Sequence, residues 1–188
     1  PETLTTFLQI MQKEAYRLEK LTQEIIQLSK GDQVTYTTES INVYQFFQQL
    51  IAGYQKVIDD KQITVDIQGP KEVDFETKMA LFYPLCKNLI ENALYYSLAN
   101  GKVLIHFTLE QGLHFTIQDF GIGISPEDIE RIYERFYRVD KARTRNTGGS
   151  GIGLSIVKDS VEQLNGSIQL DSHLGVGTTF TVYLPFLP

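Results

Sequence analysis

The sequence is poor in cysteine: Cys86 is the single one in 188 residues. A disulfide framework is therefore excluded, and a reducing compartment suits the chain. No run of about 18 apolar residues occurs, so no segment is expected to span a membrane. A signal peptide is lacking too, and the chain starts at Pro1 rather than methionine, as expected of a fragment. Basic residues are outnumbered 17 to 23, and the net charge of -6 argues against nucleic acid as a partner.

A glycine-rich loop, TGGSGIGLSIVK at 147–158, fits neither of two familiar nucleotide-binding loops. A P-loop needs lysine where Leu154 stands, and a dinucleotide loop reads G-x-G-x-x-G. Gly149, Gly151 and Gly153 read G-x-G-x-G instead. The helix predicted at 151–164 would still present unpaired N–H groups and the positive end of its dipole to an anion.

The first thirty residues carry a heptad seam, with apolar residues at alternating steps of three and four and Glu14 as the one break. A seam of this kind needs a partner, either a second helix or a second chain. The alternative is an amphipathic helix that packs on its own domain. Since Gly31 and Asp32 end the helix, we divide the chain into 1–31 and 32–188.

The sequence of residues 32–188 predicts an α+β fold. Strands are expected at 34–37, 63–67, 103–109, 113–117, 168–170 and 180–184, and helices at 41–59, 77–97, 126–137 and 151–164. The strands mostly alternate apolar and polar residues, so each buries one face. This pattern predicts a two-layer α/β sandwich, a mixed sheet with helices on one face. It disfavours the Rossmann and P-loop folds, whose strands are covered on both faces.

Two stretches place polar side chains where a ligand could use them. Asn88 and Asn92 share one helix face, and their amide oxygens suit Mg²⁺. Alternatively, the pair bonds to nearby backbone. Asp119 follows Leu113, Phe115 and Ile117 on the covered face of its strand, where it could accept the exocyclic amine of a purine. The alternative there is a turn with a helix-capping aspartate.

Two further features favour an anionic ligand. Gly121 and Gly123 would let backbone approach a ligand closely. The span 131–145 holds six basic residues in an otherwise acidic protein and leads into the glycine cluster, which suits polyphosphate. A solvated surface is the alternative for each of these basic residues.

The order of these stretches resembles the ATP-binding catalytic domain of two-component sensor histidine kinases. NLIENALYYS at 88–97 is similar to the N box of that family, DFGIGI at 119–124 to its G1 box, and YERFYRVD at 133–140 to its F box. GGSGIGL at 148–154 is similar to its G2 box, and GVGTTF at 175–180 to a third glycine element. Residues 1–30 resemble the second helix of the dimerisation and phosphotransfer hairpin.

The resemblance implies the Bergerat fold, with ATP beneath a mobile lid. Asn88 and Asn92 would hold Mg²⁺ and phosphates, while Asp119 would accept the amino group of adenine. Tyr96 would pack against the base, Thr178 would lie under it, and the glycines would form the pocket wall and the lid hinge. The implied ligand-binding positions are Asn88, Asn92, Tyr96, Asp119, Gly121, Gly123, Arg138, Lys141, Gly149, Gly151, Gly153, Leu154 and Thr178.

The resemblance also implies a reaction. Hydrolytic relatives such as gyrase commonly have a glutamate where Asn88 stands, and asparagine cannot accept a proton. Transfer of the γ-phosphoryl group of ATP to a protein histidine is therefore expected rather than hydrolysis. The acceptor histidine would lie ahead of residue 1, and His106, His114 and His173 read as surface residues. No catalytic residue is thus expected in this chain, which should bind ATP without phosphorylating itself.

Two alternatives stay open: a hydrolytic ATPase of the same superfamily, and a non-catalytic interaction module or pseudokinase. The second draws on Tyr95, where the family often has lysine or arginine. Pro84, inside the helix that bears the asparagines, should kink or restart it.

The partners implied by the resemblance are ATP and ADP, a second copy bound through the hairpin helices, and the receiver domain of a response regulator. The location implied is the cytoplasmic portion of a membrane-anchored bacterial sensor. Neither nucleic acid nor direct membrane contact by this fragment is expected.

Overall fold

The computed structural model describes residues 11, 22, 36–139 and 151–187. The heptad seam predicted in the first thirty residues lies outside this part of the chain, apart from Met11, and so do Lys141 and Gly149. Among the described residues, no helix is both long enough and apolar enough to cross a lipid bilayer.

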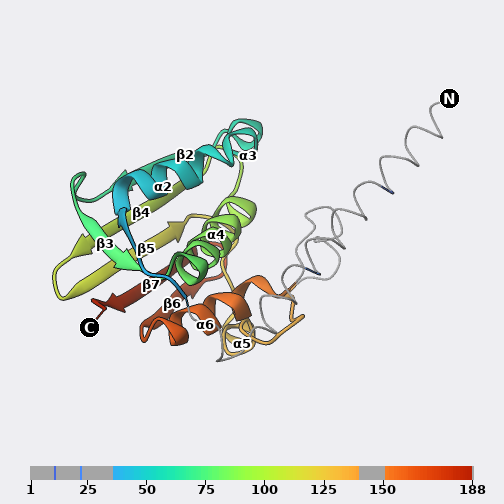
Figure 1. The fold of residues 1–188 in the computed structure, drawn as a ribbon. Helices are drawn as coiled ribbons and strands as arrows, with labels where there is room; N and C mark the ends of the chain where they lie inside the picture. The colour runs from blue at the N-terminus through green and yellow to red at the C-terminus, as the bar shows by residue number, and fades with distance from the viewer. Residues whose placement is uncertain (1–10, 12–21, 23–35, 140–150, 188) are drawn as a thin grey trace.

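A five-stranded mixed sheet forms one layer, with the strand order β2-β4-β5-β7-β6 (Figure 1). β2 pairs parallel to β4, and the other neighbours pair antiparallel. The strands are β2 (Thr64–Gln68), β4 (Lys102–Leu109), β5 (Gly112–Asp119), β6 (Ser167–His173) and β7 (Gly177–Pro185). The sequence predicted all five.

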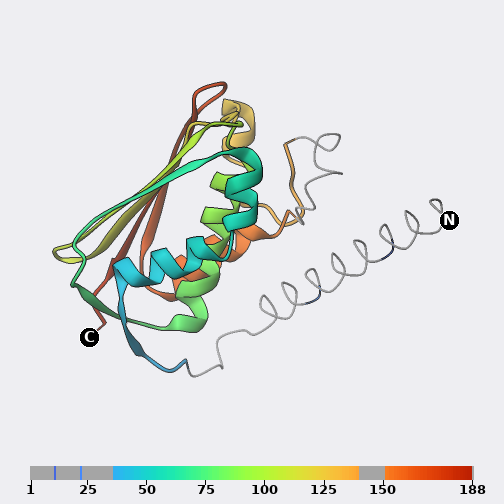
Figure 2. The ribbon, with the colours of Figure 1, turned by 90° about the horizontal axis from the view of Figure 1, so that it is seen from above.

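Helices α2 (Val43–Ala52), α4 (Met79–Tyr96) and α6 (Gly153–Gln163) lie on one face of this sheet (Figure 2). The other face has no helix among the described residues. In β5, Leu113, Phe115 and Ile117 are buried beneath the helices, while His114 between them is exposed. The predicted two-layer α+β sandwich is confirmed.

The core is rich in aromatic side chains at the junction of α2, α4 and the sheet. The Phe47 ring centroid lies 5.7 Å from that of Phe115 and 5.9 Å from that of Phe107, and Phe82 lies 6.2 Å from Phe115. All four side chains are almost fully buried. Burying each contributes about 2 kcal/mol or more, so α4 is held firmly against β5.

A second, two-stranded sheet joins β1 (Glu39–Asn42) to β3 (Asp74–Thr77) in antiparallel pairing. The strand predicted at 34–37 is wrong for its described part, since residues 36 and 37 are not in a strand. β3 was not predicted, because a four-residue strand with acidic residues on its exposed face gives little periodic signal.

Several helix boundaries also differ from the prediction. The helix expected at 41–59 divides into α2 and α3 (Gln55–Lys61), because the chain turns at Gly53 and Tyr54. The helix expected at 126–137 is confined to α5 (Pro126–Ile129), followed by turns. Of the two outcomes predicted for Pro84, a kink or a restart of the helix, the restart is wrong, because α4 continues through Pro84. The missing N–H falls in the second turn and costs one hydrogen bond.

Candidate nucleotide-binding site

Three buried polar side chains form a row across the end of the sheet. Asp119 of β5 lies opposite Thr178 of β7, and Thr178 lies opposite Ser172 of β6. Their exposed fractions are 5%, 6% and 8%, and they occupy the face covered by helices. The alternation of β5 predicted this position for Asp119. The three residues together place hydrogen-bonding groups at the edge of an otherwise apolar core.

Asp119 is the member of this row that has a shifted pKa. Burial raises its pKa to about 6, although backbone hydrogen bonds from Gly121 and Thr178 act in the opposite direction. The Gly121 N–H donates to Oδ1 at 2.9 Å. This contact is an Asx turn, so the turn alternative is partly right, but Asp119 caps no helix because α5 begins after Ser125. No described side chain bonds to the carboxylate, which leaves accepting capacity for a ligand.

The two glycines after β5 allow close approach of backbone to backbone. A Cβ at Gly121 would lie 2.0 Å from the carbonyl oxygen of Tyr96, the last residue of α4. A Cβ at Gly123, whose φ is +65°, would lie 2.0 Å from the carbonyl oxygen of His173. The sequence predicted that these glycines would let backbone approach a ligand closely. In the structure their close approach is to α4 and β6, which fixes the loop at the rim of the row.

Asn88 makes the backbone hydrogen bond that was one of the two alternatives for this residue. It is 8% exposed, and its Nδ2 donates to the backbone carbonyl of Pro84 at 2.8 Å. The amide oxygen therefore points the other way, and a Cβ added at Gly153 would lie 2.7 Å from it. Asn92, one turn further along α4, is half-buried. Both asparagines thus lie on the helix that borders Asp119.

The N-terminus of α6 meets Asn88 through Gly153. Among the described residues, no side chain caps this helix, and a helix N-terminus presents N–H groups that can donate to an anion. Gly151 has a φ of +75°, and its carbonyl accepts the N–H of Phe136 at 2.8 Å. Leu154 packs against the hydrophobic core, so its side chain supports the helix from the inner side.

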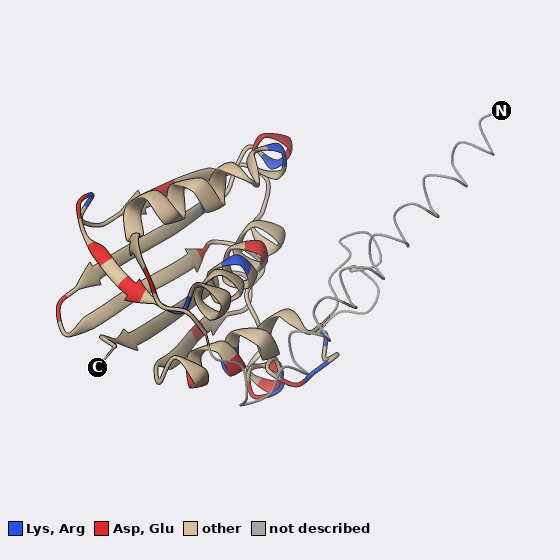
Figure 3. Ribbon diagram, in the orientation of Figure 1, with Lys and Arg blue, Asp and Glu red and all other residues tan. Residues whose placement is uncertain are grey.

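Tyr96 and Arg138 lie on the open side of the row. Tyr96 is 44% exposed; burial raises its pKa, and the charge of Arg138 lowers it, which places the guanidinium near the phenol. The other described arginines of the basic span behave as solvated surface residues. Arg131 pairs with Glu134 at 3.2 Å and Arg135 with Asp159 at 3.6 Å, and Figure 3 shows both charge signs along this stretch.

Two polar residues that frame the site were missed by sequence reasoning. Ser172 follows Ile168 and Leu170 on the inward face of β6, so the strict alternation of that strand could have identified it. Lys61, at the end of α3, donates from Nζ to the carbonyls of Leu94, Tyr95 and Ser97 at 2.6–3.1 Å. No sequence signal marks Lys61, because its partners are backbone atoms more than 30 residues away.

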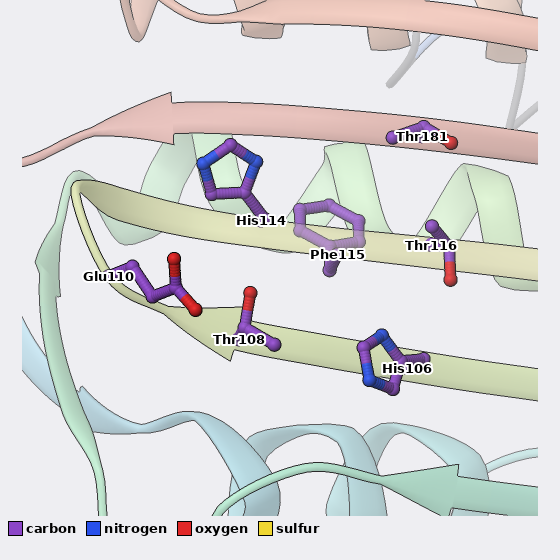
Figure 4. A pocket seen from close by; sticks show the side chains of 7 residues that line it. All are labelled: His106, Thr108, Glu110, His114, Phe115, Thr116 and Thr181. Carbon is purple, nitrogen blue, oxygen red and sulfur yellow. The ribbon is translucent and has the colours of Figure 1, made fainter.

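A shallow hollow of about 260 Å³ lies on the opposite, uncovered face of the sheet (Figure 4). It is lined by side chains that include His106, Thr108, His114 and Thr116. This confirms that His106 and His114 point away from the covered face. His173 is the last residue of β6 and is exposed beside Asp171, as expected of a surface residue. The hollow is separated from Asp119 by the sheet itself.

Comparison with known proteins gives a consistent result. The profile of a family described as histidine kinase-, DNA gyrase B-, and HSP90-like ATPase matches residues 78–188. The sensor-like histidine kinase SenX3 of Mycolicibacterium smegmatis is 35% identical over 191 residues, covering 100% of this chain and 50% of that protein. The sensor histidine kinase WalK of Bacillus subtilis is 35% identical over 185 residues, 96% of this chain and 30% of that protein. The chain therefore spans half or less of these relatives.

Solved structures share the fold. The histidine kinase AdeS of Acinetobacter baumannii has a TM-score of 0.80 at 20% identity, over 96% of this chain and 84% of that one. The catalytic domain of the histidine kinase ThkA has a TM-score of 0.69 at 20% identity, over 80% of this chain and 96% of that one. Full-length ShkA, solved in complex with AMPPNP, has a TM-score of 0.80 at 18% identity, over 96% of this chain and 38% of that one.

Proposed function

Because the chain belongs to the family of histidine kinase-, DNA gyrase B- and HSP90-like ATPases, we propose that it is the ATP-binding catalytic part of a sensor histidine kinase. It transfers the γ-phosphoryl group of ATP to a histidine on a hairpin helix, from which an aspartate of a response regulator receives it. The observation that carries this proposal is Asp119, a buried carboxylate with unused accepting capacity at the end of the sheet.

The base site follows from the polar row. The Asp119 carboxylate accepts a hydrogen bond from the 6-amino group of adenine, and Thr178 lies beneath the ring. Tyr96, half-exposed at the end of α4, packs against the base. The backbones of Gly121 and Gly123 form the adjoining wall. A purine with an amino group at this edge satisfies a carboxylate that is otherwise costly to bury.

The polar groups of α4 fit a magnesium ion. Since the Asn88 amide nitrogen is committed to Pro84, the atom it offers is a carbonyl oxygen, a hard ligand of the kind Mg²⁺ prefers. Asn92 offers a second such oxygen on the same helix face. When bound, Mg²⁺ would neutralise charge on the phosphates. No cluster of three or more His, Cys, Asp or Glu side chains that could hold a metal occurs among the described residues, so the phosphates and waters would complete its coordination.

The phosphates would lie at the N-terminus of α6, where Gly151 and Gly153 keep the backbone accessible and Asn88 is adjacent. Arg138 supplies positive charge on the same side. The proposal extends to Lys141 and Gly149, as the family resemblance implies, although both lie outside the described residues. Positioning and charge neutralisation are then the means of catalysis.

Transfer is favoured over hydrolysis because Asn88 stands where hydrolytic relatives commonly have a glutamate. Asn88 cannot accept a proton. Glu91, its nearest acidic neighbour on α4, accepts a hydrogen bond from the Tyr54 hydroxyl at 3.0 Å and lies 4.0 Å from Lys87. The Tyr54 contact lies on the side of α4 that faces the turn between α2 and α3. The hydrolytic alternative therefore has less support.

The partners proposed are a second copy, bound through the hairpin helices, and the receiver domain of a response regulator. The setting proposed is the cytoplasmic portion of a membrane-anchored sensor. These statements rest on the relatives, which are named as sensor kinases.

The test is transfer in trans. The chain is incubated with a separately produced hairpin that carries an acceptor histidine and with ATP labelled at the γ-phosphate. We expect acid-labile label on the hairpin and none on this chain, because none of its three histidines reads as an acceptor. Steady phosphate release that the hairpin does not change would favour a hydrolytic ATPase. A chain that binds no Mg-ADP by calorimetry would favour the non-catalytic module.

A further inference from the structure

Ser172 is the centre of a small hydrogen-bond network beneath the proposed base site. Its Oγ accepts the backbone N–H of Ile124 at 2.9 Å, donates to the carbonyl of Gly177 at 3.0 Å, and lies 2.9 Å from Oγ1 of Thr178. The side chain is 8% exposed. It therefore joins the loop after β5 to the start of β7, and it contacts the one hydroxyl that neighbours Asp119.

The network fixes the direction of the Thr178 hydroxyl. A serine hydroxyl carries one proton, and that of Ser172 goes to Gly177. The contact between the two hydroxyls must then use the proton of Thr178, with Ser172 as acceptor. Asp119 receives hydrogen bonds from backbone N–H groups of Gly121 and Thr178 rather than from the Thr178 hydroxyl. The Thr178 proton therefore points toward Ser172 and away from Asp119. The Thr178 oxygen keeps its remaining lone pairs as acceptors.

We propose that Ser172 is a positioning residue that sets the base preference of the nucleotide site by orienting the Thr178 hydroxyl. With that proton held by Ser172, the row presents only acceptors: the Asp119 carboxylate and the Thr178 oxygen. At position 6, a 6-aminopurine brings a donor to this edge, whereas a 6-oxopurine brings an acceptor that finds no donor, with its N1–H as the remaining donor. The inference rests on the proposed function, because it assumes that a purine binds at Asp119.

Without Ser172, the Thr178 hydroxyl loses the hydrogen bond that orients it and can rotate. It could then donate to the oxygen of a 6-oxopurine and relieve part of the mismatch. The discriminating power of the site would fall although neither Asp119 nor Thr178 had changed. A residue that only stabilised the fold would weaken adenine and hypoxanthine nucleotides equally, so the ratio of the two affinities separates the two roles.

The experiment compares ADP with IDP, whose base differs at this edge, by titration calorimetry of the full chain. The variants are Ser172→Ala, Thr178→Val and the double variant. We expect Ser172→Ala to lower the ADP-to-IDP affinity ratio by about three- to tenfold, the worth of one hydrogen bond. In the Thr178→Val background, Ser172→Ala should leave the ratio unchanged, because the hydroxyl through which it acts is gone.

Ser160→Ala is the matched control: Ser160 is 2% exposed on α6, and its loss should not alter the ratio. Ser172→Cys replaces the alanine variant if that variant does not fold, since a thiol fills the space with a weak hydrogen-bonding group. An unchanged ratio in the folded serine variant overturns the inference, as does an equal drop in the Thr178→Val background. If the unmodified chain binds neither nucleotide, the proposed function fails and this assignment fails with it.

Discussion

The burial of Asp119 makes the stability of the folded chain depend on pH. Its folded pKa of about 6 lies above its ordinary value of 3.8, chiefly because of burial. Between these values the folded chain keeps a proton that the unfolded chain has released. The contribution of Asp119 to stability is therefore most favourable at acidic pH and is lost as the pH rises through about 6. At neutral pH the folded state carries the cost of a buried charge.

Replacing Asp119 with asparagine should remove that cost and the binding together. At pH 7.5 we expect the free energy of unfolding without nucleotide to rise by about 1–3 kcal/mol, and ADP affinity to fall by about tenfold or more. The stability difference from the unmodified chain should shrink toward pH 4, where both side chains are neutral. Urea unfolding at the two pH values and calorimetry with ADP measure these effects. A variant that binds ADP normally would contradict the role of Asp119.

Gly153, at the start of α6, lies close to the Asn88 side chain. A methyl group there would press on the Asn88 oxygen at 2.7 Å. We expect Gly153→Ala to reduce the enhancement of ADP affinity by Mg²⁺ several-fold, with stability changed by about 1 kcal/mol or less, because alanine also favours the helix. Titrations with and without a chelator measure the enhancement.

Gly53→Ala is the control, because Gly53 has an ordinary helical φ at the end of α2. If Gly153→Ala keeps the full magnesium effect, the oxygen of Asn88 does not face the metal.

At the scale of elements, α4 carries most of the site and is fixed at its C-terminal end by two contacts. Lys61 donates to two of its last carbonyls and to that of Ser97, the residue after it. The loop after β5 donates from Ile122 N to the carbonyl of Tyr96 at 3.2 Å. A cation at a helix C-terminus also opposes the negative end of the dipole. The position of Tyr96 therefore depends on residues far from it in sequence.

Lys61→Met removes these bonds while keeping the length of the side chain. We expect the free energy of unfolding to fall by about 1–2 kcal/mol, and amide exchange to accelerate in the last turn of α4. Lys56→Met is the control, since Lys56 is exposed on the same helix α3. Equal stabilities of the two variants would show that the Lys61 contacts contribute nothing.

The sequence could predict elements whose periodicity is long and regular. The alternation of apolar and polar residues in β4 and β5 predicted which side chains face the core, and with them the burial of Asp119. It could not predict β3, whose four residues are stabilised by pairing with β1 rather than by their own pattern. Lys61 was equally out of reach, because a lysine that binds distant carbonyls resembles any surface lysine. Ser172 was within reach, as a polar residue at an inward position of β6.

At the scale of the whole molecule, the buried hydrophobic residues among those described form one core cluster. Every buried hydrophobic residue among those described lies at Val43 or beyond. We expect deletion of 1–31 to leave the melting temperature within about 2 °C, since a shift of that size corresponds to under about 1 kcal/mol, and ADP affinity unchanged. A fall of about 5 °C or more would instead indicate that the segment packs on the domain, as the amphipathic alternative predicts. Calorimetric melting and ADP titration of both forms decide between them.

The small sheet of β1 and β3 determines where a mechanical force on the chain from its N-terminal side would arrive. Glu39 to Asn42 align with Thr77 to Asp74, and α4 begins two residues after Thr77. Because ladder hydrogen bonds run perpendicular to antiparallel strands, a pull along β1 loads all of these bonds in shear together. Tension applied to the chain ahead of β1 is therefore transmitted through β3 to the N-terminus of α4, the helix that contains Asn88 and Asn92.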